Sequence, residues 1–472
     1  MKDKRNKIND TPLIFLAIPI LIEMVMAYMV PFVDIYFLSQ QSDLSVSAVS
    51  AVMPILLMGM SLIGAFQVGG ISVCSKLVGA KKRYSLLVMQ TWLVVCVACV
   101  GLLLSIFYMF SGEYLLNLMS VDPTFYAEAL SYYQIWGGGI FFLGVYICFS
   151  ALLIVRGEMK FIIVSGLVMN IVNVTLGYAL IGGNLGFDVY QAKGAAIASV
   201  VAWVIADVII ISAALNIVGV RLSIRSIKKS GRLSLNPLLK VAIPGMIEPI
   251  SYQMAQMALV IIVVAISDLS LIARAYLVNF FYITNIWNLA IASAIQTKLA
   301  NSLGAGSILQ AKRDVNYAIA LGVGGALFIS LLIFIFGEDI ITVYTTDQAA
   351  IELVLALLWL NVIIDVGRSL NIVMGGVLKA SGDAFIFATI GVVGTWLLAV
   401  GLGYGLAFYS GLALLGVWIA SAIDENIRGA LSVARWLSGA WRREIEGGVS
   451  CNRKSKALAP NALKSSSEVY AS

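Results

Sequence analysis

Residues 19–38, PILIEMVMAYMVPFVDIYFL, are apolar enough to cross a bilayer, yet they include two carboxylates, Glu23 and Asp34. These acids are eleven residues apart, so a helix places them on nearly the same face, roughly 16 Å apart along its axis. An ionised carboxylate in hydrocarbon is costly unless it meets water, a partner or a proton, and such residues usually mark a transport pathway. Pro31 lies one turn before Asp34 and frees a backbone carbonyl, which predicts a kink in the helix at the acid.

The composition shows what surrounds these carboxylates. Of the 472 residues, 60% are hydrophobic and 12% are charged, and the mean hydropathy is +0.95. A water-soluble protein with this composition would expose large apolar patches, so the sequence predicts an integral membrane protein. Apolar runs of roughly 20 to 30 residues recur along the chain, and each can cross the hydrocarbon layer as a helix. Short alternating strands are absent, which argues against a β-barrel.

We therefore predict an all-α polytopic membrane protein with twelve transmembrane helices. The predicted spans are residues 12–37, 46–75, 86–110, 126–153, 161–183, 193–217, 236–266, 270–300, 314–336, 350–377, 384–408 and 411–437.

Lysine and arginine fall on alternate connections between these spans. They gather in the N-terminal segment, in the loop after the second span (Lys81, Lys82) and in the connection 219–235, whereas the intervening connections carry mainly acids. Because basic loops remain in the cytoplasm, both termini are expected to be cytoplasmic. The predicted location is the cell membrane, in bacteria the inner membrane.

An internal repeat is visible at a constant offset along the chain. Pro19 and Glu23 match Pro244 and Glu248, Gly79 matches Gly304, and Gly157 matches Gly382, all with the same separation in sequence. These matches predict two homologous six-helix lobes of parallel topology, residues 1–218 and 236–438. A cytoplasmic linker, 219–235, joins them, and a cytoplasmic tail, 439–472, is expected to be disordered. Transporters built from repeats bind substrate between the repeats and work by alternating access.

Other functional classes fit the sequence less well. The chain has no histidine, which removes the commonest proton shuttle and metal ligand, so any proton coupling must use carboxylates. Neither the short selectivity filter of a channel nor a convergent nucleophile or acid/base pair is visible. We therefore predict that the protein is not an enzyme and needs no cofactor.

Several short motifs resemble those of the multidrug and toxic compound extrusion (MATE) family, over about residues 12–443. The most specific are P-x-x-x-E followed by V-D in the first span, Arg-Gly with a downstream Asn at 156, 157 and 173, GAAIASV opening the sixth span, IPGMIE, LGAG, R-x-x-N through GVLKASGD, and DENIR followed by RWLSGAW. The resemblance implies export of organic cations and other amphipathic drugs in exchange for inward sodium ions or protons. It leaves open which ion is used and which substrate is carried.

The family pattern also implies a cation site around Asp34. It places Asn173 and Ser199 near this acid, where they would supply oxygen ligands for Na⁺ or hydrogen bonds for a neutral carboxyl. Asp34 and Asn173 are the candidate Na⁺ ligands. The candidate coupling residues are Asp34, Asn170, Asn173, Ser199 and Asp207. The second lobe has Leu259 at the position equivalent to Asp34, so whether that lobe holds an ion site stays open.

The candidate substrate-cavity residues are Glu23, Tyr28, Glu248, Tyr252 and Tyr282. Aromatic rings attract flat cations, and carboxylates at the mouth of a cavity would draw cations in. For Glu23 and Glu248 the alternative is structural, since each follows a proline by about one turn and could bond freed backbone groups. The expected partners are small cationic or amphipathic drugs and membrane lipid, with no nucleic acid, and we expect a monomer.

Charged residues elsewhere in the second lobe give a structural expectation and a rival function. Asp365 and Arg368 have i, i+3 spacing and are expected to neutralise each other. Asp424, Glu425 and Arg428 are expected to form an internal network. The rival function is a flippase for a lipid-linked precursor, which would favour clustered inward-facing arginines. Only Arg274 and Arg368 lie away from the basic side, so the sequence favours the exporter.

Overall fold

The computed structural model describes residues 7–119, 121–230, 235–345 and 347–439, and within them the regular structure is helical. The predicted tail lies almost entirely outside the described residues. The first half contains α1 (Lys7–Asp10), α2 (Leu13–Ser39), α3 (Asp43–Gly79), α4 (Arg83–Leu118), α5 (Tyr126–Gly138), α6 (Ile140–Arg156), α7 (Lys160–Ile181), α8 (Gln191–Ser212) with the π-helical turn η2 (Ala213–Ile217), and α9 (Ile224–Ser230).

The second half repeats this order. It contains α10 (Asn236–Val264), α11 (Asp268–Gly304), α12 (Ile308–Ile335), α13 (Gly337–Tyr344), α14 (Gln348–Ser381), α15 (Ala384–Gly394) continued by the π-helical η4 (Thr395–Leu402) and η5 (Gly405–Tyr409), and α16 (Ala413–Leu437).

The twelve predicted spans all correspond to helices in the structure. In the described residues, eleven helical stretches are long and apolar enough to cross a membrane. The twelfth, α16, carries Asp424, Glu425 and Arg428 near its middle. Most helices extend beyond the predicted ends, because turns that leave the hydrocarbon continue as helix with polar residues. The short helices α1, α9 and α13 were not among the predicted elements.

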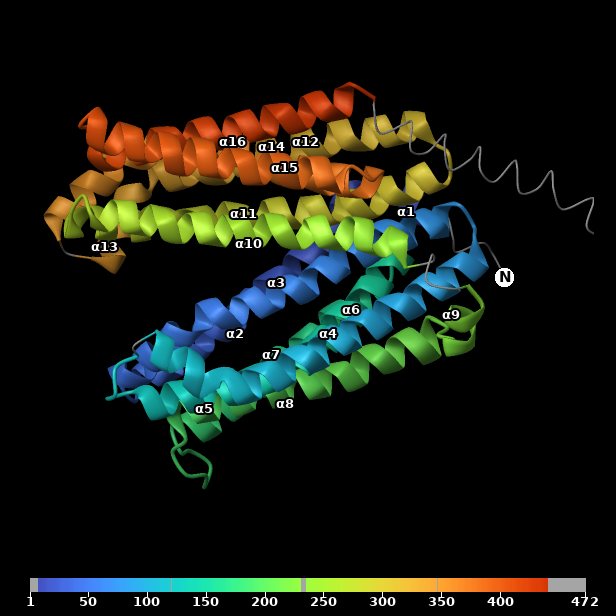
Figure 1. The fold of residues 1–472 in the computed structure, drawn as a ribbon, viewed down its shortest axis with the longest axis horizontal. Helices are drawn as coiled ribbons and strands as arrows, with labels where there is room; N and C mark the ends of the chain where they lie inside the picture. The colour runs from blue at the N-terminus through green and yellow to red at the C-terminus, as the bar shows by residue number, and fades with distance from the viewer. Residues whose placement is uncertain (1–6, 120, 231–234, 346, 440–472) are drawn as a thin grey trace, which may run out of the picture.

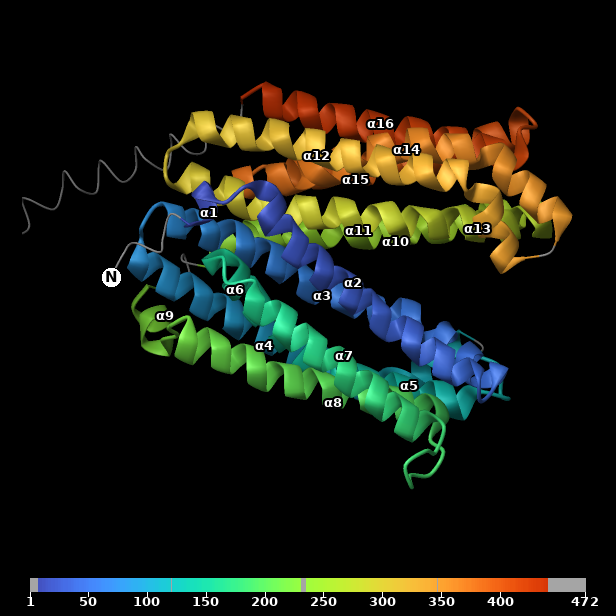
Figure 2. The same ribbon diagram turned by 180° about the vertical axis from the view of Figure 1, so that it is seen from behind.

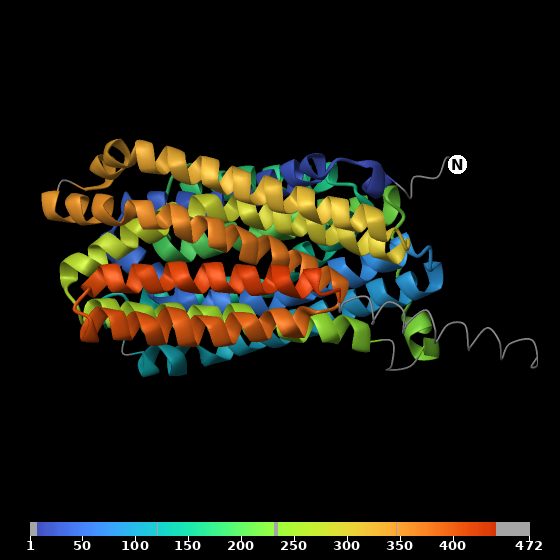
Figure 3. The ribbon, with the colours of Figure 1, turned by 90° about the horizontal axis from the view of Figure 1, so that it is seen from above.

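The helices form two bundles that meet at one end (Figures 1 and 2). The bundles converge near α1 and α9 and diverge toward α5 and α13. We call the converging end, which carries Lys81, Lys82, Lys228 and Lys229, the basic end. Figure 3 shows the C-terminal bundle in front, with its helices nearly parallel along the long axis.

The hydrophobic core follows the same division. One cluster runs through the N-terminal lobe and into α11, α12 and α14 near the basic end, for example through Ile295 and Val377. A second cluster, including Leu277 and Trp418, lies entirely within the other half of the C-terminal lobe. The two lobes therefore share a core at the basic end and have separate cores further away.

Equivalent local signals begin and end helices in both lobes. Ser42 and Ser267 are related by the offset of the repeat, and their side chains cap α3 and α11 by accepting hydrogen bonds from backbone N–H groups. Gly157 and Gly382 follow α6 and α14 with φ values of 70° and 108°, a left-handed conformation that side chains rarely adopt. The repeat read from the sequence thus extends to caps and turns.

Near the basic end, the backbones of α3 and α11 cross where each has a glycine. A Cβ atom on Gly79 would collide with the Asn301 carbonyl, and one on Gly304 would collide with the Lys76 carbonyl. Lys76 and Asn301 are themselves equivalent positions of the repeat, so the contact has the reciprocity expected of a twofold axis. The relation supports two parallel repeats about an axis along the membrane normal.

Polar contacts also join the lobes near the basic end. Gln296 on α11 donates to the Val68 carbonyl at 2.8 Å and to Ser72 Oγ at 2.7 Å. Lys298 donates to the Thr11 carbonyl at 2.8 Å and pairs with Asp314 at 3.2 Å. The bonds to Val68, Ser72 and Thr11 cross between halves that are far apart in the sequence, so they hold the lobes together at this end.

We expect Gly79→Ala to lower the free energy of unfolding by about 1–3 kcal/mol, because the new methyl group overpacks a backbone contact. The matched control is Gly324→Ala on α12, where an added Cβ meets no atom within 4 Å. Thermal unfolding in detergent measures both. Equal melting temperatures for the two variants would contradict the proposed crossing.

Candidate cation-binding site

Asp34 lies inside the N-terminal lobe at the end of a short hydrogen-bonded chain. Its side chain is 4% exposed, and its Oδ2 accepts a hydrogen bond from Ser199 Oγ at 3.2 Å. Ser199 in turn accepts from Asn173 Nδ2 at 3.2 Å. These three residues come from α2, α8 and α7. The structure therefore brings Asp34, Asn173 and Ser199 together, as the family pattern implied.

Small residues on α8 allow this close approach. Its first turns include GAAIASV, and Gly194 packs so closely on α7 that a Cβ there would lie 2.8 Å from the Leu180 carbonyl oxygen. Small residues let helix backbones meet in this way. The short side chain of Ser199 can then reach Asp34 across the interface. The motif thus sets both the packing and the position of the hydroxyl.

Among the three hydrogen-bonded residues Asp34, Ser199 and Asn173, two oxygens have no hydrogen-bond partner in the described part of the structure. They are Oδ1 of Asp34 and Oδ1 of Asn173. Buried polar atoms usually have partners, and exceptions call for a functional or structural explanation. Tyr132 on α5 lies within electrostatic reach of Asp34. A carboxylate, an amide and a hydroxyl can ligate a hard cation or surround a protonated acid. The geometry is compatible with either ion.

The other two predicted coupling residues lie outside the hydrogen-bonded chain. Asn170 donates to the Gly166 carbonyl of its own helix at 2.9 Å. Asp207 is buried on α8, about 12 Å along the helix from Ser199 toward the basic end. Helical spacing placed both near Asp34. It did not anticipate that Asn170 would bond its own backbone, nor that Asp207 would face another set of residues.

The predicted cavity residues are divided between the lobes. Glu23 on α2 and Glu248 and Tyr252 on α10 are partly exposed, and Tyr282 on α11 is exposed. Glu248 packs on α15, where a Cβ on Gly391 would lie 2.8 Å from its Cγ. Tyr28 lies on α2, but its side chain is outside the described part of the structure. A role for these residues in a substrate cavity stays a prediction.

A buried charge network occupies the C-terminal lobe. Arg368 does not form the direct ion pair with Asp365 that the spacing predicted. It pairs with Glu425 at 3.1 Å, and its guanidinium lies 4.2 Å from the centroid of the Phe281 ring. Asp365 instead accepts hydrogen bonds from Thr284 and Ser330. The hydroxyls were missed because they belong to α11 and α12, far from Asp365 in sequence.

Arg428 completes the network on α16. Its side chain is 2% exposed and pairs with Asp424 at 2.8 Å and Glu425 at 3.1 Å. Asn371 donates to Glu425 Oε2 at 3.1 Å, the same oxygen that pairs with Arg428. The structure therefore contains the internal network expected from D-E-x-x-R. Two arginines balance two acids here, whereas the hydrogen bonds of Asp34 involve neutral groups.

Gly394 at the end of α15, the helix before α16, leaves room for the buried arginine. A Cβ on Gly394 would lie 2.7 Å from Cγ of Arg428, so a larger residue there would displace the side chain. Directly after Gly394, α15 changes to the π-helical η4. π-helical turns inside α-helices often occur at functional sites. Here the change coincides with the buried network.

Twelve membrane helices in two repeated lobes, with buried carboxylates between the helices, define a polytopic membrane transporter. Comparison with known proteins gives the family. The MatE family model matches residues 19–179 and 244–405, and the chain belongs to this family. The two matches begin at positions 19 and 244, the prolines that mark the repeat in the sequence. The predicted family and the predicted two-lobed fold are both confirmed.

Among curated proteins, the chain is similar to "Uncharacterized transporter YisQ" of Bacillus subtilis, with 26% identity over 423 residues, covering 90% of this chain and 93% of the relative. It is also similar to "Probable multidrug resistance protein NorM" of Bacillus anthracis, with 25% identity over 364 residues, covering 74% and 78%.

Solved structures support the fold. The chain matches "Crystal structure of MATE in the bent conformation" with a TM-score of 0.87 at 17% identity, covering 94% of this chain and 100% of that chain. It matches "Outward-facing conformation of a multidrug resistance MATE family transporter of the MOP superfamily" with a TM-score of 0.86 at 18% identity, covering 95% and 99%.

We expect Arg428→Met to lower the free energy of unfolding by about 3–5 kcal/mol, because it leaves two buried acids without their shared cation. Adding Asp424→Asn should recover part of the loss, since Glu425 keeps Arg368. Arg225→Met, on the exposed face of α9, is the matched control. Thermal unfolding in lipid or detergent is the measurement. A melting temperature for Arg428→Met equal to that of the control would show that the network does not stabilise the fold.

Proposed function

We propose that this protein is a secondary active exporter that exchanges organic cations or amphipathic drugs for inward H⁺ or Na⁺. The observation that carries the proposal is the buried Asp34 carboxylate. It is hydrogen-bonded through Ser199 to Asn173 and keeps Oδ1 without a partner in the described structure. A group of this kind can take up and release a small cation as its surroundings change.

The substrate class is inferred from relatives and from the aromatic side chains of the C-terminal lobe. Relatives of 24 to 25% identity are named as multidrug resistance or multidrug and toxin extrusion proteins. Tyr252 on α10 and the exposed Tyr282 on α11 are near enough to interact electrostatically within the C-terminal lobe. Aromatic faces bind cations through the ring quadrupole. This supports a substrate region that includes these tyrosines, together with Glu248.

The arrangement of the lobes supports a transport cycle by alternating access. If the basic end is cytoplasmic, as the positive-inside rule indicates, the contacts of Gln296 and Lys298 close the cytoplasmic side in the described state. Binding of the ion at Asp34 then has to favour one state of the lobes over the other, since only a difference in affinity shifts the equilibrium. The helix α2 continues through Pro31 without a break. Because proline has no N–H, one backbone hydrogen bond is missing there, close to Asp34, and the helix is easier to bend at this point.

The flippase alternative receives less support from the charges. Two of the arginines in the C-terminal lobe, Arg368 and Arg428, are paired with acids, and Arg274 donates to Gln256 at 3.0 Å. Engaged in this way, they do not form the free cationic cluster that an anionic headgroup would require. We also propose that the protein acts as a monomer, without a cofactor, with both termini in the cytoplasm and lobe boundaries at 1–218 and 236–438.

We expect Asp34→Asn to abolish gradient-driven export while the fold remains stable, because an amide retains hydrogen-bonding capacity but cannot bind a proton or neutralise Na⁺. The measurement is accumulation of a fluorescent organic cation in proteoliposomes under separately imposed pH and sodium gradients. Asp188→Asn, which changes an exposed acid between α7 and α8, is the control. Full accumulation against a gradient by the Asp34→Asn variant would refute the assignment.

A further inference from the structure

A second set of polar side chains lies in the N-terminal lobe, closer to the basic end than Asp34. It comprises Glu23 on α2, Tyr146 and Ser150 on α6, Ser165 on α7 and Asp207 on α8, and we call it the inner polar group. Relative to the Asp34 chain, Glu23 is displaced by roughly 16 Å along α2, and Asp207 and Ser165 by roughly 12 Å along α8 and α7. The same membrane helices therefore carry two polar layers.

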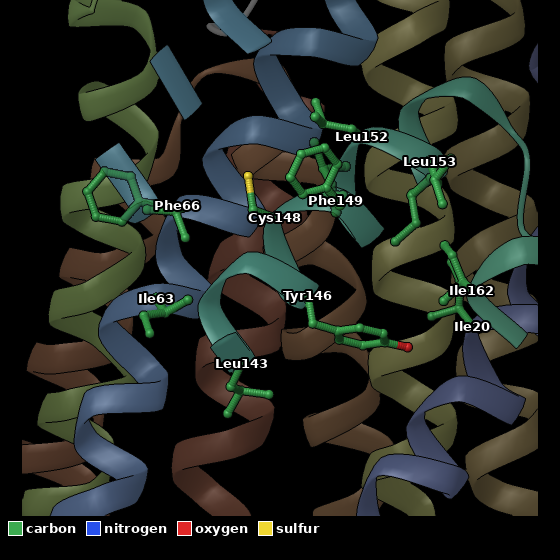
Figure 4. Close-up of a cluster of buried hydrophobic side chains, with 14 of the residues drawn as sticks. Ile20, Ile63, Phe66, Leu143, Tyr146, Cys148, Phe149, Leu152, Leu153 and Ile162 are labelled. Atoms are coloured by element: carbon green, nitrogen blue, oxygen red, sulfur yellow. The ribbon is translucent and has the colours of Figure 1, made fainter. Parts of the chain in front are cut away.

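Tyr146 lies at the centre of the inner polar group. Its side chain is 5% exposed, and its phenol group interacts electrostatically with the carboxyl groups of Glu23 and Asp207. Its hydroxyl lies where α2 and α7 meet, since a Cβ on Gly166 would be 3.5 Å from that oxygen and 3.6 Å from Met26 Cε. Figure 4 shows the hydroxyl directed toward the side where Ile20 and Ile162 lie.

Three buried polar atoms of the inner polar group have no hydrogen-bond partner among the described residues: Tyr146 Oη, Ser150 Oγ and Asp207 Oδ1. Asp207 is 6% exposed, so bulk water does not compensate it. Leaving such atoms unpaired in an apolar interior is costly, which indicates that this region handles a ligand, water or a proton. Glu23 is partly exposed and therefore connects the group to the surface of the lobe.

The surroundings of Asp207 contain acids, phenols and thiols. Helices α2, α3, α5, α6 and α7 pack against α8. On these helices, the titratable side chains that interact with Asp207, directly or through Tyr146 and Cys148, are Glu23, Cys74, Tyr146 and Cys148. Tyr132 on α5 interacts with Asp34 instead. The nearest guanidinium in these contacts belongs to Arg156, which interacts with Cys74 and Gln90. Within the described residues, no interaction of Glu23, Tyr146 or Asp207 involves a lysine or arginine.

We propose that Glu23, Tyr146 and Asp207 form a second proton-binding site, separate from the Asp34 chain, through which protons pass between Asp34 and the basic end. Two ionised carboxylates beside one phenol, without a cation, would be strongly unfavourable in an apolar interior. At least one of the two acids therefore holds a proton. Na⁺ needs several oxygen ligands that converge on one point, whereas a proton needs only one oxygen to hold it. Because Glu23, Tyr146 and Asp207 come from three different helices and do not converge, we assign the site to a proton.

The phenol lets the proton move between the acids without a change in net charge. Tyr146 Oη makes no direct hydrogen bond to either acid, so the transfer takes place through bridging water molecules. The Glu23 carboxyl gives its proton to a water, which passes one of its own protons to the Tyr146 oxygen. The Tyr146 O–H bond breaks, and that proton reaches Asp207 through a second water in the same way. One O–H bond forms for each one broken. The inner polar group then holds a proton about two helical turns from the Asp34 chain along α8. This role rests on the proposed ion-coupled function.

Infrared difference spectroscopy between two pH values tests proton binding directly on the full-length protein in lipid. We expect a titrating carboxylic-acid band that is lost in Asp207→Asn or Glu23→Gln and persists in Asp34→Asn. Glu113→Gln, at an exposed acid on α4, is the control. If neither Asp207→Asn nor Glu23→Gln removes a titrating band, the inner polar group does not bind a proton and the proposal is overturned.

Transport in proteoliposomes tests the relay. We expect Asp207→Asn and Tyr146→Phe to slow pH-driven export at least about tenfold, with substrate affinity unchanged. Tyr114→Phe, at an exposed tyrosine on α4, is the control for the phenol. The Asp207→Asn and Glu23→Gln effects should be less than additive, because both acids serve one path. Full rates in all three variants would overturn the relay.

The two proposals fail in different ways. If Asp34→Asn still accumulates substrate, the proposed function fails, whatever the infrared bands of the inner polar group show. If Asp34→Asn is inactive but the inner variants keep full rates and all titrating bands, only the second site fails. Bands of the inner polar group that respond to sodium at fixed pH, and not to pH, would show Na⁺ binding and overturn the proton assignment.

Discussion

The cost of placing a charge in hydrocarbon determines how each lobe treats its acids. In the C-terminal lobe, Asp424 and Glu425 are paired with Arg428 and Arg368, which offsets part of the cost of burying their charges. Asp365 of the same lobe accepts hydrogen bonds from two hydroxyls. In the N-terminal lobe, Asp34 meets hydroxyl and amide groups, and one of its oxygens has no partner in the described structure. The arrangement of Asp424 and Glu425 pairs each acid with a fixed positive charge, and that of Asp34 leaves a carboxylate oxygen available, as the proposed cation binding requires.

This difference is notable because the lobes are repeats. Helix caps, left-handed glycines and the crossing of α3 with α11 recur at the same offset, so the scaffold is common to both halves. The acids do not recur in the same way, since Leu259 stands where the first lobe has Asp34. A duplicated scaffold thus carries a carboxylate among neutral hydrogen-bonding groups in one copy and a network of paired charges in the other.

Hydropathy and the internal repeat were sufficient to predict the fold, because a helix in hydrocarbon must satisfy its own backbone hydrogen bonds and so follows the apolar segments closely. Helix ends were less predictable, since helices continue into polar surroundings. Within the candidate site, the proximity of Asp34, Asn173 and Ser199 could be expected from family motifs. The partners of Asp365 and the neighbours of Asp207 could not, because side-chain direction and contacts between distant helices are set by packing.

The glycine crossing near the basic end affects how the lobes can move. Helices that pack through large side chains are held at preferred angles by ridges that fit into grooves. At Gly79 and Gly304 themselves, the contact joins backbone to backbone. Such a contact depends weakly on the angle between the helices, so a rotation of the lobes, as the proposed transport cycle requires, would disturb this contact least. In the proposed cycle, the crossing is the place about which the lobes would turn.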